Sequence, residues 1–391
     1  MLKNKVATMN KITSGIGSNT GQSNSKLVIY KSLLNSNGDM RYIPKPNTMD
    51  VTKKFKVVNA LDVETWQQFV DQHPQGNIFH KPEMFQIFAQ AQNYNPSLWT
   101  VIDDSEQVQA ILLPVQVTVI GGPLRSLTTR AILYGSVLCA PDPYAMQALD
   151  VLLSAYQRQM KQKVLFTELR HLSDMKDLQP VLCKRGFVYE DHLNYLINLN
   201  RSAEELLQSL GRRTRKNIRR GLRDGKVQVT EVKDRSEIGQ WYDTLKKTYK
   251  NVKVTLADVS LFEATFDELY SKGMAKFLLA KVDGVNAACS LELIYKDVIY
   301  GWYGGSDREF SQYLPNEMLM WHILEWGANN GYRVYDFGGA GKPGEAYGVR
   351  DFKAKFGGEL VCFGRNNYVH APVLLNLSKM GYSLYRRLFL K

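Results

Sequence analysis

From Phe55 to the end of the chain, one order of predicted secondary structure runs twice. In each half, two amphipathic helical segments precede a pair of alternating strands joined by a tight turn. A further strand, a long helix and two more strands follow. The first strand pair turns at residues 103–106 and the second at Asp283–Gly284. Because duplication of one unit explains a repeated order most simply, the sequence predicts two copies of a mixed α+β unit, although other α+β layers share parts of this order.

Composition places the chain among globular proteins, since 391 residues with 44% hydrophobic content can bury two cores. The N-terminal segment has no apolar stretch of signal-peptide length, and no apolar run approaches that of a membrane-spanning helix. The four cysteines lie far apart, with no C-x-x-C pair and none near a histidine, which indicates neither a zinc site nor a disulfide framework. We therefore expect a cytoplasmic protein without a metal, whose contact with a membrane, if any, is peripheral.

The formal net charge of +12 is concentrated in two segments. Residues 1–54 carry nine Lys or Arg against two Asp, and residues 209–226 carry eight against one acid. Two such clusters favour anionic partners. Residues 1–54 are also rich in Asn, Ser and Gly without sustained periodicity, so we predict a flexible basic tail there.

The domain prediction follows from the tail and the repeat. A first domain is expected over residues 55–197 and a second over residues 198–391. The second is expected to end in a helix at about 372–389. Its apolar residues at helical spacing, predicted to pack against the first domain, are Leu374, Leu377, Met380 and Leu384.

Residues 335–360 read YDFGGAGKPGEAYGVRDFKAKFGGEL and contain seven glycines. The segment starts where a predicted strand ends, and its glycines allow positive φ and close approach of a ligand. It is not a Walker loop, because Pro343 follows Lys342 where Ser or Thr is required, and it holds no dinucleotide-binding fingerprint. It is either a polar connecting loop or one border of a substrate site.

Three stretches of the second half resemble the FemA/FemB/FemX family of peptidoglycan interpeptide-bridge aminoacyltransferases, which are built from two GNAT-like domains. They are YLINLNRSAEELLQSLGRRTRKNIRRGLRDG (195–225), GWYGGSDREFSQYLPNEMLMWHILEWGANNGYRVYDFGG (301–339) and YGVRDFKAKFGGEL (347–360). The resemblance implies two tandem GNAT-like acyltransferase domains, each a twisted, mostly antiparallel sheet with flanking helices. Residues 211–250 lack the long helical arm that some members insert, which places the chain nearer the arm-less members.

The resemblance also implies catalytic roles. Lys353 in the pair Phe352–Lys353 matches the lysine that sits at the reactive carbonyl, where it could stabilise developing negative charge. On the residues alone, Lys353 also fits a surface lysine that alternates with buried phenylalanines. Asp336 either orients the incoming amine or accepts its proton, or it caps Gly338 and Gly339 through an Asx turn.

Further substrate contacts are expected on three segments. Lys355 would share a face with Lys353 in an extended strand and contact phosphate. A basic helix at about 204–224 suits pyrophosphate or tRNA phosphates, although a solvated amphipathic helix is the simpler alternative. Aromatic rings beside glycines suit a substrate groove, although core packing explains them as well. The predicted substrate-binding residues are Arg212, Arg215, Lys216, Arg219, Tyr303, Gly304, Gly305, Gly338, Gly339, Lys342, Tyr347 and Lys355.

The leading hypothesis is transfer of an amino acid from aminoacyl-tRNA to an amine of a nucleotide- or lipid-linked peptidoglycan precursor, with no tightly bound cofactor. The alternative is an acyl-CoA-dependent GNAT enzyme acting on a polysaccharide or another cell-envelope substrate, because relatives with the same second domain are described in that way. The usual CoA pyrophosphate loop is missing from SDREFSQYLPNEM (306–318), which argues against acyl-CoA. A nucleic-acid-binding protein without catalysis would explain both basic clusters, but not the glycine-rich segment.

Overall fold

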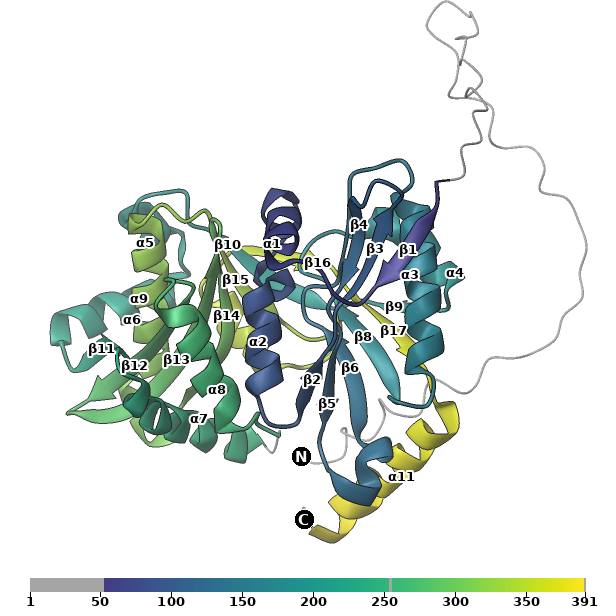
Figure 1. The fold of residues 1–391 in the computed structure, drawn as a ribbon. Helices are drawn as coiled ribbons and strands as arrows, with labels where there is room; N and C mark the ends of the chain where they lie inside the picture. The colour runs from purple at the N-terminus through teal and green to yellow at the C-terminus, as the bar shows by residue number, and fades with distance from the viewer. Residues whose placement is uncertain (1–52, 253–254, 390–391) are drawn as a thin grey trace, which may run out of the picture. The chain divides into compact units, whose positions relative to one another are not determined.

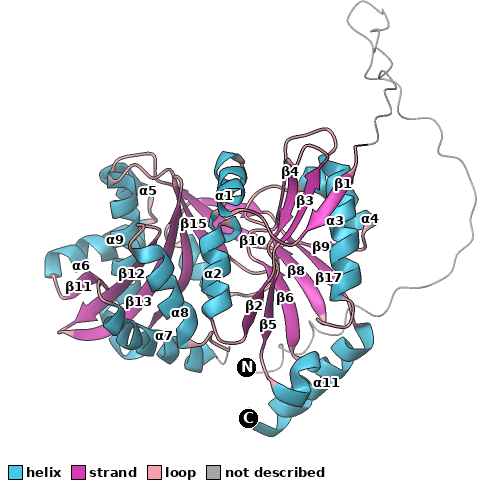
Figure 2. Ribbon diagram, in the orientation of Figure 1, coloured by secondary structure: helices cyan, strands magenta, loops and turns pink. Residues whose placement is uncertain are grey.

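The computed structural model describes residues 53–252 and 255–389 (Figures 1 and 2). The predicted tail therefore lies outside the described residues, apart from Lys53 and Lys54. The described residues from Lys53 onward belong to one compact unit.

The first half alternates short strands with helices. Its strands are β1 (Phe55–Val58), β2 (Tyr94–Pro96), β3 (Trp99–Asp103), β4 (Val108–Leu112), β5 (Val115–Thr118), β6 (Thr129–Leu133), β7 (Val137–Cys139), β8 (Phe166–Arg170) and β9 (Val188–Glu190). Its helices are α1 (Val63–Gln72), η1 (Ile78–His80), α2 (Pro82–Gln90), η2 (Gly122–Leu127), α3 (Ala145–Met160), η3 (Lys176–Leu178) and α4 (Gln179–Lys184).

The second half repeats this pattern with longer strands. Its strands are β10 (Leu193–Asn198), β11 (Val227–Glu231), β12 (Ala275–Val282), β13 (Val285–Tyr295), β14 (Val298–Ser306), β15 (Val334–Gly339), β16 (Glu359–Cys362) and β17 (Arg365–Val369). Its helices are α5 (Ala203–Ser209), α6 (Arg212–Asp224), η4 (Arg235–Glu237), α7 (Ile238–Val252), α8 (Val259–Thr265), η5 (Phe266–Tyr270), η6 (Arg308–Tyr313), α9 (Pro315–Asn329), α10 (Gly348–Ala354) and α11 (Pro372–Phe389).

The two halves pair their strands in the same order. A seven-stranded sheet runs β11-β12-β13-β14-β15-β10-β16, in which β14 and β15 are parallel and the other neighbours antiparallel. The first half splits its strands between the sheets β1-β3-β4-β7 and β2-β5-β6-β8-β17-β9, and here β6 and β8 form the parallel pair. The matching order confirms the predicted α+β fold with two tandem GNAT-like units.

Two strands cross the domain boundary that the sequence predicted at residues 197 and 198. Strand β10 joins the sheet of the second half, between β15 and β16. Strand β17, from the end of the chain, enters the sheet of the first half between β8 and β9. Each insertion satisfies the backbone groups of two strand edges, so the boundary between the sheets does not coincide with a single point in the sequence.

The halves also share a hydrophobic core. Phe79 and Phe88 belong to the same buried cluster as Trp241, Phe262 and Phe277 of the second half. Helix α2 packs against α8, as Figure 1 shows. The first half therefore helps to fix the helices that lie over β13 and β14.

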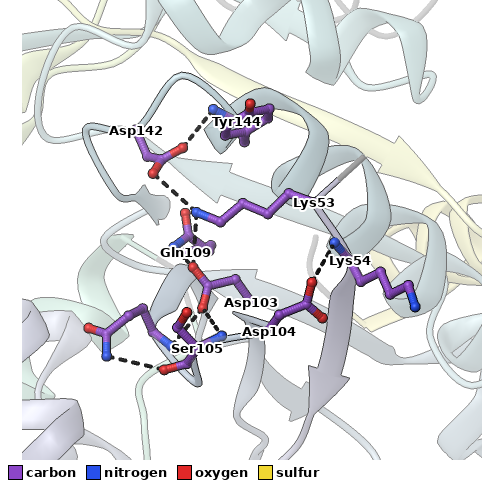
Figure 3. Close-up of polar contacts among 9 residues, drawn as sticks. Lys53, Lys54, Asp103, Asp104, Ser105, Gln109, Asp142 and Tyr144 are labelled. Atoms are coloured by element: carbon purple, nitrogen blue, oxygen red, sulfur yellow. Dashed lines mark hydrogen bonds and ion pairs between the residues drawn. The ribbon is translucent and has the colours of Figure 1, made fainter. Parts of the chain in front are cut away.

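The described chain begins with an anchored lysine. The Lys53 ammonium lies 2.9 Å from the Asp103 carboxylate and 3.3 Å from that of Asp142 (Figure 3). Asp103 also accepts hydrogen bonds from the main-chain N–H groups of Ser105 and Gln107. Lys53 thus ties the start of β1 to the turn after β3 and to the segment before α3.

Two helices in the structure differ in detail from the prediction. The basic helix expected at about 204–224 is two helices, because Leu210 is extended (φ −68°, ψ 150°) and Gly211 follows it. Helix α11 contacts η2 of the first half. However, Leu377 and Met380, which were expected to pack there, are 50% and 69% exposed.

Candidate active site

Strands β14 and β15 separate at the centre of the second half. Their parallel register joins residues 298–300 to residues 334–336 and ends at the pair Tyr300–Asp336. Beyond this pair, β14 continues along β13 to Ser306, whereas β15 continues along β10 to Gly339. Beyond Tyr300, the edge of β14 that faces β15 is therefore no longer paired with it.

Asp336 lies at the point of separation and is 4% exposed. Its Oδ1 accepts hydrogen bonds from Asn194 Nδ2 and from the Gly338 N–H, both at 2.7 Å. The second bond is the Asx turn that was one of the two interpretations of this residue. Burial raises the pKa of Asp336, while these two donors and the nearby charge of Lys353 oppose the rise. The position of the carboxyl leaves its predicted role toward an amine open.

Lys353 is buried, at 8% exposure, and its interpretation as a surface lysine is wrong. Its Nζ donates to the carbonyl oxygens of Phe337 (2.6 Å), Gly338 (3.1 Å) and Gly339 (2.8 Å). An ammonium has three donors, so all of them are used on the end of β15. Burial lowers the pKa of Lys353 to about 8, and the negative charge of Asp336 opposes this effect. Lys353 therefore fixes the shape of the strand end beside Asp336.

The segment around Lys353 is the helix α10 and not the extended strand that the sequence predicted. Phe352 and Phe356 lie four residues apart and contact each other, with ring centroids 5.2 Å apart. This spacing fits one face of a helix as well as one face of a strand, which explains the error. In the helix, Lys355 does not share the environment of Lys353. It lies over the Phe352 ring and pairs with Glu317 at 3.2 Å.

The loop between β15 and α10 is held by hydrogen bonds to its backbone. Arg350 Nε donates to the Ala340 carbonyl at 2.8 Å, and its guanidinium also contacts the Lys342 carbonyl. The Lys342 ammonium is paired with Glu190 at 2.7 Å. Tyr347 is exposed and precedes α10. The predicted contacts Lys342 and Tyr347 thus border the loop, and Lys342 already has an anionic partner.

The glycines of this region have distinct structural reasons. Gly338 has φ +67°, and a Cβ on Gly339 would come within 2.7 Å of His192 Nε2. A Cβ on Gly305 would lie 2.5 Å from Thr248 Oγ1, so Gly305 lets α7 approach β14 closely. Gly304 is exposed and has no such close neighbour. Of the predicted pair, only Gly304 has room for a ligand beside it.

Tyr303 belongs to an aromatic wall on β14. Its ring packs edge-on against Phe262 at 4.8 Å and contacts Trp302 and Tyr249. Burial raises the pKa of Tyr303 well above its usual value. The contacts show the packing of the Tyr303 ring, and its predicted contact with a substrate stays a prediction.

The predicted basic residues of this helix either bind other groups of the protein or are exposed to solvent. Arg215 donates to the Gln208 carbonyl at 2.7 Å, and Arg219 pairs with Glu204 at 3.1 Å. Arg212 and Lys216 are exposed. Buried Thr214 and Ile218 set the rotation of α6 against the rest of the protein.

A cavity of about 360 Å³ lies between α6, the start of α9 and Lys355. Its lining residues are Arg213, Thr214, Asn217, Leu314, Glu317 and Lys355. Leu314 precedes α9 without a side-chain cap, so main-chain N–H groups of the first turn are directed toward this end. Sequence reasoning predicted Lys355 but missed Arg213, Thr214, Asn217 and Glu317.

A buried charged cluster on the first half lies next to Gly339. Glu168 accepts hydrogen bonds from Arg170 (2.6 Å) and Arg365 (3.2 Å). Although burial opposes it, these two guanidinium groups lower the pKa of Glu168 to about 2. Arg365 also contacts His192 Nε2 at 2.9 Å. The strand exchange by β17 therefore places a second cation beside the loop that follows Asp336.

The first half closes the equivalent point between its parallel strands. There Ser136 Oγ lies 2.8 Å from His171 Nδ1, and His171 Nε2 lies 2.6 Å from Asn366 Oδ1. These three side chains are at most 6% exposed. The sequence offered no such Ser/His arrangement, because Asn366 arrives on the distant strand β17. The three polar side chains hydrogen-bond one another in the interior of the first half.

Among the described residues, no cluster of three or more His, Cys, Asp or Glu side chains could hold a metal ion. The four cysteines are free thiols. Within the same part of the chain, no helix combines the length and the hydropathy needed to cross a membrane.

Comparisons with known proteins agree with this geometry. A family model described as an acetyltransferase (GNAT) domain matches residues 208–354, which include β14, β15 and α10. A lipid II:glycine glycyltransferase of Staphylococcus aureus is 21% identical over an alignment that covers 43% of this chain and 56% of the relative. The chain thus spans little more than half the length of that relative.

Solved structures extend the likeness in fold to most of the chain. The crystal structure of FemX matches with a TM-score of 0.62 at 18% identity, covering 84% of this chain and 99% of that one. A tandem GNAT protein from the clavulanic acid biosynthesis pathway matches with a TM-score of 0.51 at 9% identity, covering 82% and 99%. Taken with the separated strands and the lysine-held strand end, these findings show a GNAT domain over residues 208–354, in a chain whose fold is similar to those of FemX and of a tandem GNAT protein.

Proposed function

We propose that the protein transfers an aminoacyl group from aminoacyl-tRNA to an amine of a peptidoglycan precursor. The single observation that carries the proposal is the separation of β14 and β15 at Tyr300 and Asp336, with Lys353 fixing the adjoining strand end. The likeness to a lipid II:glycine glycyltransferase supports the acceptor class.

The acceptor amine attacks the ester carbonyl of the donor between the two strands. The carboxyl of Asp336 orients the amine and accepts its proton, since its pKa is raised and it lies at the point of separation. The carbonyl oxygen gains negative charge as the C–N bond forms. When the tetrahedral intermediate collapses, the ester C–O bond breaks and the 3′-oxygen of the tRNA leaves with the proton that Asp336 returns. The three donors of Lys353 are held by carbonyls of β15, so its contribution is through its charge, which stabilises the oxyanion because a buried ammonium is poorly screened.

The donor phosphates occupy the cavity beside α9. Arg213 and Lys355 supply two cations, against one carboxylate from Glu317. The first turn of α9 adds main-chain N–H donors and the positive end of the helix dipole. The same features would also accept the pyrophosphate of acyl-CoA, so the donor must be decided by experiment.

The donor test uses both candidates with the same acceptor. The full chain is incubated with a nucleotide-linked muropeptide precursor and either charged tRNA or acetyl-CoA. The mass of the precursor is then measured by mass spectrometry. The proposal expects an increase by one or more aminoacyl residues that depends on intact charged tRNA. An acetyl increase from acetyl-CoA, with none from any charged tRNA, would establish the alternative.

A further inference from the structure

Large apolar side chains are exposed on two segments that contact each other at one end of the first half. Val119, Ile120 and Leu124 belong to the connection between β5 and β6, and each is about half exposed. Val373, Leu377 and Met380 lie on α11, where Val373 is 72% and Met380 69% exposed. Helix α11 contacts η2 of that connection, and Figure 1 shows them side by side. We call these six residues the α11–η2 surface.

The apolar stripe on α11 is not what attaches the helix to the protein. Val373, Leu377 and Met380 follow each other by four and three residues, which places them on one helix face. The start of the helix is instead held by His370 and Ala371, whose N–H groups donate to the Leu165 carbonyl. Ala371 is buried, and Leu374 and Leu375 are half-buried. No described residue buries the outward stripe, so this face of α11 can contact a partner.

Basic residues surround the α11–η2 surface. Arg125 and Lys379 are exposed within its two elements, and Lys161 and Lys163 are exposed in the turn before β8. Hydrogen bonds from Leu165 to Thr129 and from His370 to Leu165 bring the three segments together. The three segments, residues 107–141, 151–167 and 360–391, contain no Asp or Glu.

We propose that the α11–η2 surface docks on an anionic lipid bilayer. Apolar side chains of this size enter the boundary between headgroups and acyl chains, while flanking lysines and arginines meet anionic headgroups. A second copy of the chain suits the surface less well, because a twofold contact would bring two basic rims together. The inference does not depend on the reaction chemistry. Only its consequence, that the site then works beside a lipid-linked acceptor, rests on the proposed function.

Co-sedimentation with vesicles tests the surface directly. The full chain is mixed with vesicles of phosphatidylcholine alone, or of phosphatidylcholine with phosphatidylglycerol, at low and high salt. The wild type is expected to bind the phosphatidylglycerol vesicles more tightly, and less so at high salt. The combined substitution Val373→Ser, Leu377→Ser and Met380→Ser should weaken binding at least about tenfold, because three apolar groups no longer leave water.

A matched control carries Val188→Ser and Val285→Ser, two exposed valines on β9 and β13. It should bind vesicles like the wild type. Leu124→Ser provides an independent change in η2, should the triple substitution disturb α11. Arg125→Gln with Lys379→Gln should reduce the preference for phosphatidylglycerol and leave the weaker binding to phosphatidylcholine unchanged.

Three results would overturn the inference. The first is no preference of the wild type for anionic vesicles, and the second is equal binding by the wild type, the triple variant and Leu124→Ser. The third is a wild-type dimer in solution that the triple variant dissociates, which would make the surface a contact between copies. Transfer to a nucleotide-linked, soluble precursor should be unchanged in every variant, so failure of docking and failure of the proposed function remain distinguishable.

Discussion

The Lys353 ammonium on α10 lies 2.6 Å from the main-chain carbonyl oxygen of Phe337 on β15. This bond joins the helix after the glycine-rich loop to the strand that carries Asp336. Two more carbonyl oxygens, of Gly338 and Gly339, accept from the same nitrogen. Lys353 thus has a structural role. A test of its catalytic role must measure stability and activity separately.

Lys353→Met should lower kcat by roughly two to three orders of magnitude, the effect of losing one oxyanion stabiliser. It should also lower the free energy of unfolding by about 1–3 kcal/mol, because buried carbonyls lose a charged donor. Kinetics and thermal unfolding measure the two effects. Lys355→Met removes the neighbouring exposed ammonium, which lines the proposed donor cavity, so it should raise KM for the donor but leave kcat near that of the wild type and is the control for kcat alone. Equal kcat for Lys353→Met and the wild type, with chemistry limiting the rate, would remove Lys353 from the mechanism.

Arg213→Ala should raise KM for the donor by about tenfold to a hundredfold, because a charge-assisted contact to phosphate is lost. Arg212→Ala is the matched control on the same turn of α6, since Arg212 is exposed and does not line the cavity. KM is measured separately for donor and acceptor. An equal rise for both variants would indicate a general effect of the basic helix and would refute a specific site at the cavity.

Activity should fall as pH rises through about 8, the pKa to which burial lowers Lys353. The ammonium loses its proton there, so both the oxyanion stabiliser and the contact to the strand end weaken. Lys353→Arg keeps the charge to much higher pH, so any residual activity of this variant should not show the fall. A pH–rate profile under single-turnover conditions measures this, and an identical alkaline limb in the two proteins would assign it to another group.

The stability of the protein should fall as the pH rises from about 4.5 to about 7, because Glu292 is buried. Burial raises its pKa from 4.5 to about 7, and Tyr335 Oη lies 3.0 Å from its Oε2. Between pH 4.5 and about 7, Glu292 keeps its proton in the folded chain but loses it in the unfolded chain. Its contribution to stability is therefore present at low pH and is lost as the pH rises. The loss amounts to about 3 kcal/mol at most. Denaturant unfolding should show this slope in the wild type and a smaller one in Glu292→Gln; parallel profiles would show that Glu292 is not the source.

Removal of residues 1–52 should leave the melting temperature unchanged. Lys53 remains in this shortened chain, and its ion pairs with Asp103 and Asp142 hold the start of β1 (Figure 3). Lys53→Ala in the same shortened chain should lower the melting temperature slightly. A large loss of stability on truncation alone would show that the basic segment contributes to the fold.

The repeated element order was readable from the sequence because its signals are local. The turn at Asp283–Gly284 needs positive φ at both positions, and the structure has φ 49° and 81° there. The exchange of β10 and β17 could not be read in the same way, because strand pairing between distant segments leaves no local pattern.

The candidate site likewise contains residues that local sequence patterns indicate and residues that they do not. Asp336 could be proposed from the sequence because it lies just before the glycine-rich segment, although the strand β15 continues past it to Gly339. Arg213 was missed because the rotation of α6 is set by the burial of Thr214 and Ile218, and not by the number of arginines around it. The hydrogen bonds of Lys353 depend on a helix whose Phe352–Phe356 spacing also fits a strand.

Single-turnover transfer by Asp336→Asn tests the central claim, that acyl transfer occurs where β14 and β15 separate. Asparagine keeps the acceptor for the Gly338 N–H and nearly the same volume, but it cannot take the proton of an amine. With enzyme in excess over aminoacyl-tRNA and a saturating soluble, nucleotide-linked precursor, we expect the rate to fall by about two orders of magnitude or more while donor binding is retained. A wild-type rate of aminoacyl transfer in Asp336→Asn would contradict the account, because the reacting amine would then lie elsewhere.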